Sequence, residues 1–192
     1  TAVVGATITA WSATANGLFV VSNGAAAGGA DIVLDRMILR LRSTAPTGTL
    51  VMNFEAYNET GIVAGTTAVV TRTPIQVNTG EAQTSVATVQ AFAAGAITIP
   101  AAAGTRRLQG TASLVTGVAV DGDVYELQFG ADGAGWKNGG AAARATDPAY
   151  ITAGMGPVII APQTTSWINM WWLTQAANVP SWEYSLGFLE TD

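Results

Sequence analysis

The sequence contains no cysteine and no histidine among its 192 residues. The lack of cysteine excludes disulfide bridges, thiolate nucleophiles and sulfur-based metal sites. The lack of histidine removes the side chain that most often acts as a general base near neutral pH and is also the commonest metal ligand. Catalysis would have to depend on carboxylates, hydroxyls or Lys137. We therefore expect a protein that is not an enzyme and that has no catalytic site, no cofactor and no metal.

Charge is also scarce, because charged residues make up 11% of the chain against about 25% in ordinary soluble domains. The net charge of −5 argues against a direct nucleic-acid partner, which would require a basic stripe. No apolar run reaches the roughly 18 residues that a membrane-spanning helix needs. The nearest stretch, residues 86–104, is interrupted by Gln90 and Pro100 and lacks the basic start of a signal peptide. We expect no membrane association.

Strand patterns account for most of what remains. In "RMILRLR" (36–42), Met37, Leu39 and Leu41 alternate with arginines, a period of two that places the two sets on opposite faces of a strand. No segment has a convincing helical period, and the Ala-rich stretch 83–94 comes nearest to one. The chain therefore predicts an all-β, antiparallel, jelly-roll-like β-sandwich with long Gly/Ala-rich loops. Further strands are predicted at 2–10, 17–22, 49–57, 67–77, 107–120, 123–129, 156–162, 166–174 and 181–190.

Two turns predict local pairing of consecutive strands. Residues 43–48 suggest a hairpin between 36–42 and 49–57, which would place Arg36 opposite Glu55. The pair Asp121-Gly122 favours a two-residue hairpin loop between 107–120 and 123–129.

The chain length predicts one domain. Residues 1–16 form an N-terminal extended arm or a first strand, and residues 17–192 form a single β-sandwich domain. Three long loops of small residues, at 22–31, 91–105 and 130–150, are expected to become ordered against a neighbouring molecule.

Carboxylates offer two alternatives to a purely structural role. A glycosidase would need Glu55 and Glu126 on adjacent strands, about 5–5.5 Å apart for a retaining mechanism. A calcium site could use Asp121, Asp123 and Glu126, or Asp132 with Asp147, although turn chemistry explains the first group without a metal.

Arginine supplies the largest basic cluster. Arg36, Arg40 and Arg42 lie on one face of the predicted strand. The stripe could contact an acidic partner, or it could guard an exposed strand against aggregation.

Aromatic residues are concentrated in the last two predicted strands, which carry four of the six tryptophans. The strand 166–174 is apolar on both faces, so we expect it to be covered on both sides. One face can belong to the sandwich core, and a neighbouring subunit would cover the other. A carbohydrate platform and a purely internal core are the alternatives. The candidate interface residues are Trp167, Met170, Trp171, Trp172, Trp182, Tyr184 and Phe188, together with Arg36, Arg40 and Arg42.

The segments "GDVYELQFG" (122–130) and "YSLGFLETD" (184–192) resemble strands of trimeric jelly rolls of the complement C1q and tumour necrosis factor kind. In that family the aromatic final strand helps to build a three-fold seam. The resemblance implies a homo-oligomer, expected to be a trimer.

The Ala/Gly/Thr-rich chain, ending in "APQTTSWINMWWLTQAANVPSWEYSLGFLE", also resembles capsid decoration (cement) proteins of tailed bacteriophages. That resemblance implies a structural protein of the virion, made in the host cytoplasm and placed on the capsid exterior. It would bind the major capsid protein, with residues 1–16 and the Gly/Ala loops on the shell. The alternatives are a carbohydrate- or receptor-binding module, which would stack sugars on Trp136 or on exposed tail aromatics, and a shell-forming capsid subunit.

Overall fold

The computed structural model describes residues 3–4, 17–42, 49–60, 70–72, 74, 84–91, 107–130, 150–172 and 181–191. Within these ranges the chain forms strands joined by turns, and it contains no helix that could cross a bilayer. The strands are β1 (Val3–Val4), β2 (Gly17–Asn23), β3 (Asp31–Arg42), β4 (Thr49–Thr60), β5 (Val70–Arg72), β6 (Ala87–Ala91), β7 (Arg107–Val118), β8 (Val124–Phe129), β9 (Tyr150–Met155), β10 (Ile159–Ile160), β11 (Thr164–Trp172) and β12 (Ser181–Thr191).

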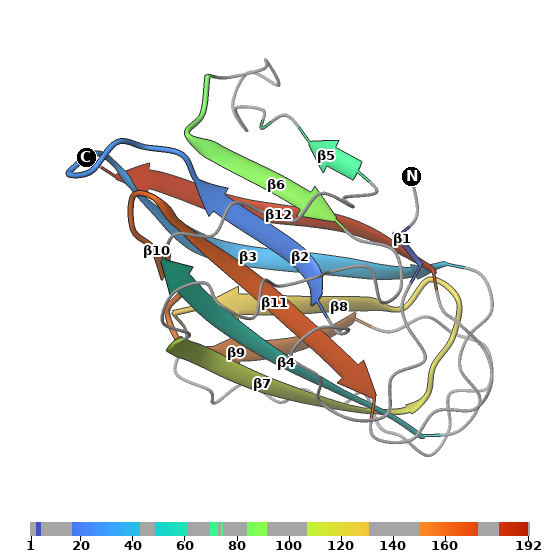
Figure 1. The fold of residues 1–192 in the computed structure, drawn as a ribbon. Coiled ribbons are helices and arrows are strands. Elements are labelled where there is room, and N and C mark those ends of the chain that lie inside the picture. Colours follow the sequence, from blue (N-terminus) through green and yellow to red (C-terminus); the bar gives the residue numbers. More distant parts are fainter. Residues whose placement is uncertain are drawn as a thin grey trace.

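The strands form two layers (Figure 1). One layer, which we call the β3 sheet, has the order β1-β12-β3-β8-β9, and β10 also pairs with β3. The other layer, the β4 sheet, has the order β5-β6-β2-β11-β4-β7. Pairing is antiparallel throughout except between β8 and β9. The predicted all-β sandwich is confirmed.

The strand order follows from a single long hairpin that is rolled up. Four antiparallel pairs, β1 with β12, β2 with β11, β3 with β8 and β4 with β7, join the first half of the chain to the second. Rolling this ribbon brings β12 beside β3 in one layer and β11 beside β4 in the other. This is the arrangement of a jelly roll, a double sheet of eight strands.

Both predicted hairpins are wrong because consecutive strands cross between the layers. β3 lies in one sheet and β4 in the other, so Arg36 pairs with Gly187 and Gln128, not with Glu55. The Asp121-Gly122 turn does exist, with a positive φ of 91° at Gly122, but it connects β7 to β8 in opposite layers. Alternation identifies a strand and its two faces, and it carries no information on which strand lies alongside.

Two further differences concern single strands. The Ala-rich stretch 83–94 contains the strand β6, whose Ala87, Val89 and Ala91 are buried in the core. Strand β9 was not predicted, and it pairs in parallel with β8. In the N-terminal segment, Val3 and Val4 pair with Trp182 and Ser181. The loop 22–31 is described, whereas residues 92–105 and 131–149 lie outside the described part of the chain.

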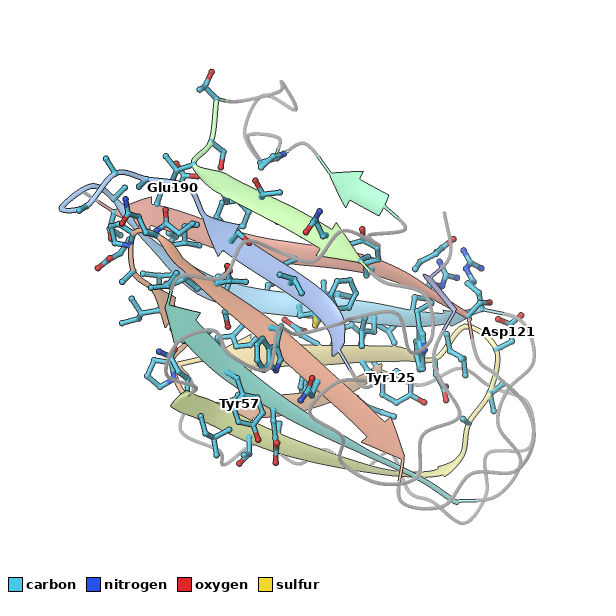
Figure 2. All side chains as sticks on the ribbon, viewed as in Figure 1. Tyr57, Asp121, Tyr125 and Glu190 are labelled. Carbon is cyan, nitrogen blue, oxygen red and sulfur yellow. The ribbon has the colours of Figure 1, made fainter. Side chains whose placement is uncertain are left out.

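Alternating apolar side chains of the two sheets meet between the layers. Met37, Leu39 and Leu41 of β3 are fully buried there, and so are Tyr125 of β8 and Trp182 of β12. Figure 2 shows Tyr125 between the layers, Asp121 at one end of the sandwich and Glu190 at the other. The Tyr125 and Trp182 rings pack edge to face with their centroids 5.6 Å apart, a favoured geometry for aromatic pairs.

Strand β10 ties the two layers together near the Glu190 end. It pairs with β3 of one sheet, while side chains of the other sheet bind its backbone. The buried Asn23 donates to the Ile160 carbonyl oxygen at 2.8 Å. Gln109 accepts from the Ile159 N–H at 2.9 Å and donates to the Ile159 carbonyl oxygen at 3.2 Å. These bonds satisfy backbone groups that a two-residue strand would otherwise leave open.

Candidate docking face

The outer face of the β3 sheet begins with the alternation of β3 itself. Met37 and Leu39 point into the core and are fully buried, while Arg36 and Arg40 are exposed. Arg42 follows on the same outer face and is half-buried. The predicted outward stripe of arginines is therefore confirmed.

Neighbouring strands extend this face on both sides of β3. Arg40 lies between Glu183 of β12 and Val124 of β8, and Tyr150 of β9 follows beside Val124. Residues directly opposite in antiparallel strands have Cβ atoms about 4.5–5.5 Å apart, so Glu183, Arg40 and Val124 lie side by side on this face. We call this surface the docking face, meaning the outward side chains of β3 between Val33 and Arg42 and those beside them on β12, β8, β9 and β10.

An apolar row closes the docking face at the Glu190 end of the sandwich. A bulge between Gly187 and Phe188 shifts the register there, and beyond it Val33 lies between Leu189 of β12 and Ile159 of β10. Leu189 is 62% exposed and Ile159 is 44% exposed.

Exposed large hydrophobic side chains gather on this one face. The described residues include four of them, and Leu189, Tyr150 and Ile159 all belong to the docking face. The fourth, Leu108, lies on the β4 sheet. Single exposed apolar residues are normal, but three of these four lie on one face, which makes it the candidate surface for a protein contact.

Polar side chains of the docking face are partly engaged with one another. Arg42 and Glu183 form an ion pair of 3.0 Å across β3 and β12, and this hydrogen bond holds the pKa of the Glu183 carboxyl below its usual range. The Tyr150 hydroxyl donates to Glu126. That bond and partial desolvation raise the pKa of Tyr150, while the positive charge of Arg36 opposes the rise.

The formal charges of the docking face balance. Three arginines stand against Glu126, Glu183 and Asp35, whose carboxylate lies next to Gly187. The whole chain carries −5, so the net negative charge belongs to the remainder of the molecule. The docking face is the neutral part of an acidic protein.

The aromatic residues of the last two strands lie elsewhere. Trp182 is fully buried in the core, and Trp167 is 1% exposed on the outer side of the β4 sheet. The ring centroids of Trp167 and Tyr57 are 5.9 Å apart. The expectation that β11 is covered on both faces is confirmed for residues 164–169, which are all buried. One chain provides that cover by itself, so the premise that a second subunit is needed to hide these two indoles is not met.

The remaining aromatic candidates divide into two groups. Tyr184 and Phe188 are half-buried against the core from the inner side of β12. The ring centroids of Tyr184 and Phe19 are 4.5 Å apart. Met170, Trp171 and Trp172 lie in β11, but their side chains fall outside the described residues, as does Trp136.

The carboxylates considered for catalysis or calcium are not brought together. Glu55 projects from β4 and Glu126 from β8, on the outer faces of different sheets, so they cannot form a catalytic pair.

Asp123, considered for a calcium site, is fully buried and accepts hydrogen bonds from the Val120 N–H at 2.9 Å and the Tyr125 hydroxyl at 3.2 Å. These bonds fix the turn. Among the described residues, no group of three acidic side chains could hold a metal. Asp132 and Asp147 lie outside them.

Sequence reasoning found the arginines of the docking face and missed its apolar row. The alternation of β12 places Leu189 on the same face as Glu183, so one signal for that row was present. Ile159 joins the face only because β10 pairs with β3, and no local pattern predicts that pairing. No protein-family model, curated protein or solved structure matches the chain.

Proposed function

We propose that the protein is a capsid decoration protein of a tailed bacteriophage, which assembles into a homotrimer and binds the major capsid protein on the outside of the virion. The observation that carries the proposal is the docking face, a neutral sheet surface on which arginines and exposed hydrophobic side chains are concentrated. The resemblance of the C-terminal strands to decoration proteins supplies the biological setting.

The composition of the docking face suits contact with another protein. Tyrosine and arginine are enriched in protein interfaces and in their energetic hot spots, and Tyr150, Arg36 and Arg40 are exposed side by side with Ile38 and Val124. A β-sheet face gives these side chains a rigid support, because β3 and β8 are held on both sides by their neighbours and the edge strand β9 is paired with β8. Rigid side chains lose less conformational entropy on binding.

Decoration would stabilise the shell by mass action. A protein that binds the assembled shell but not free shell subunits lowers the free energy of the assembled state by RT ln(1 + [L]/Kd), which is about 2.7 kcal/mol per site at a hundredfold excess over Kd. No reaction is required, so the function needs no catalytic residue.

The carbohydrate-binding alternative has lost two of its candidate stacking rings. Trp167 and Trp182 are 1% and 0% exposed, and a ring that is covered by its own chain cannot stack under a sugar. Trp136 and the tail tryptophans Trp171 and Trp172 remain for that function, and their side chains lie outside the described residues.

Cosedimentation tests the proposal directly. Shells assembled from the major capsid protein encoded in the same genome should pull the protein down saturably, and their dissociation temperature should rise with its concentration. Shells of an unrelated phage serve as the control and should pull down none. Binding to a glycan array together with no binding to the cognate shells would replace decoration with the carbohydrate-binding alternative.

A further inference from the structure

We propose that the docking face is the surface through which copies of this chain bind one another. The inference deepens the proposed function by naming the occupant of that face. It rests on the distribution of charge and of exposed apolar side chains over the described residues.

Charge favours a second copy over an acidic partner. Copies of a molecule with a net charge of −5 repel one another, and the repulsion is smallest where the approaching surfaces are neutral. On the docking face three arginines are matched by Glu126, Glu183 and Asp35. An acidic partner would instead favour a surface with a clear excess of positive charge.

The charged groups are also arranged so that a copy of the same face can complement them. Arg42 is engaged with Glu183 and Glu126 accepts from Tyr150, while Arg36 and Arg40 are exposed and, among the described residues, form no ion pair. Their guanidinium groups keep donors for carboxylates and carbonyl oxygens of the facing copy.

Apolar side chains supply the driving force. Leu189 and Ile159 flank Val33 and are 62% and 44% exposed, so covering this row removes most of their remaining contact with water. Tyr150 lies three strands from Leu189, about 14 Å across the sheet at a strand spacing of about 4.8 Å. It is also displaced by roughly 20 Å along the strands, because Tyr150 is level with Arg40 and Leu189 is level with Val33. The apolar groups therefore anchor opposite margins of the face, with the arginines between them.

Two exposed leucines allow a matched experiment. Leu189→Glu places a charge in the docking face, and Leu108→Glu places the same charge at a leucine that is 53% exposed on the β4 sheet. By light scattering after size exclusion, the wild type should have a mass at least twice the 19.6 kDa of one chain. The Leu189 variant should dissociate at concentrations at least tenfold higher, and the Leu108 variant should behave as the wild type.

A second variant protects the test against a folding defect. Arg40 is exposed and its side chain leaves the core untouched, so Arg40→Glu should keep the circular dichroism spectrum while it weakens association. A wild type that stays at 19.6 kDa at any reachable concentration would overturn the inference, as would assembly that tolerates both docking-face variants. If a protein that failed this test still bound the cognate shells, this inference would fail while shell binding would stand, and a monomeric wild type would also exclude the homotrimer. Assembly through this face without shell binding would instead remove the proposed function.

Discussion

Replacing Trp182 with alanine tests whether the C-terminal aromatics stabilise a single chain. The side chain is fully buried between the layers, against Tyr125. A tryptophan buries up to about 250 Å², which at about 25 cal/mol per Å² gives an upper limit near 6 kcal/mol. The alanine retains part of this area, and measured losses for such truncations are about 3–5 kcal/mol. We expect the free energy of unfolding to fall by about 4 kcal/mol.

Urea denaturation followed by fluorescence measures this change. With an m-value of about 2.5 kcal/mol/M, a loss of 4 kcal/mol lowers the midpoint by about 1.5 M. Trp182→Phe is the control, because it retains an aromatic ring beside Tyr125 and should lose less than half as much. The reasoning is refuted if the loss stays below about 1.5 kcal/mol. It is also refuted if the difference from wild type shrinks on dilution, which would place the indole between subunits.

Two other perturbations test the edges of the sandwich. Gly110→Ala would place a Cβ atom 2.7 Å from Met155 Cγ, where the two sheets meet, and should cost about 1–3 kcal/mol in thermal unfolding; an unchanged melting temperature would contradict this close packing. The bond to Glu126 favours neutral Tyr150, so its contribution to stability is complete below about pH 10 and is lost as pH rises through the raised pKa. Ultraviolet difference titration should show a late-titrating tyrosine signal that is smaller by one tyrosine in Tyr150→Phe and moves to lower pH in Glu126→Gln; no change in the latter would exclude this cause.

Local patterns predicted the faces of the strands better than their partners. The alternation around Leu39 correctly assigned the core side and the arginine side of β3. It could not show that β3 would pair with β12, about 150 residues away in sequence, because a strand of given alternation fits many neighbours. The Asp121-Gly122 turn was recognised from its residue types, yet a tight turn can connect two layers as readily as two strands of one sheet.

Small residues concealed two strands. Ala87 and Ala91 favour a helix when judged alone, but in β6 they fit the core beside β2. In β9, Ala153 and Gly154 contribute little strand propensity, and the parallel pairing with β8 that holds them depends on the completed sheet. The sequence predicted only part of the docking face, because its arginines lie along one strand. Its apolar row comes from three strands and therefore depends on long-range strand pairing.

The pairing of Val3 with Trp182 has a consequence for synthesis in the cell. At about 5–20 residues per second, translation of the roughly 150 residues from β3 to β12 takes about 8–30 s, so β12 becomes available well after β3. Until then β1 has no strand to join, and β3 lacks the neighbour that shields one of its edges. Nascent chains therefore present an open strand edge, the feature through which β proteins aggregate, and a chain terminated before Ser181 would leave that edge open permanently.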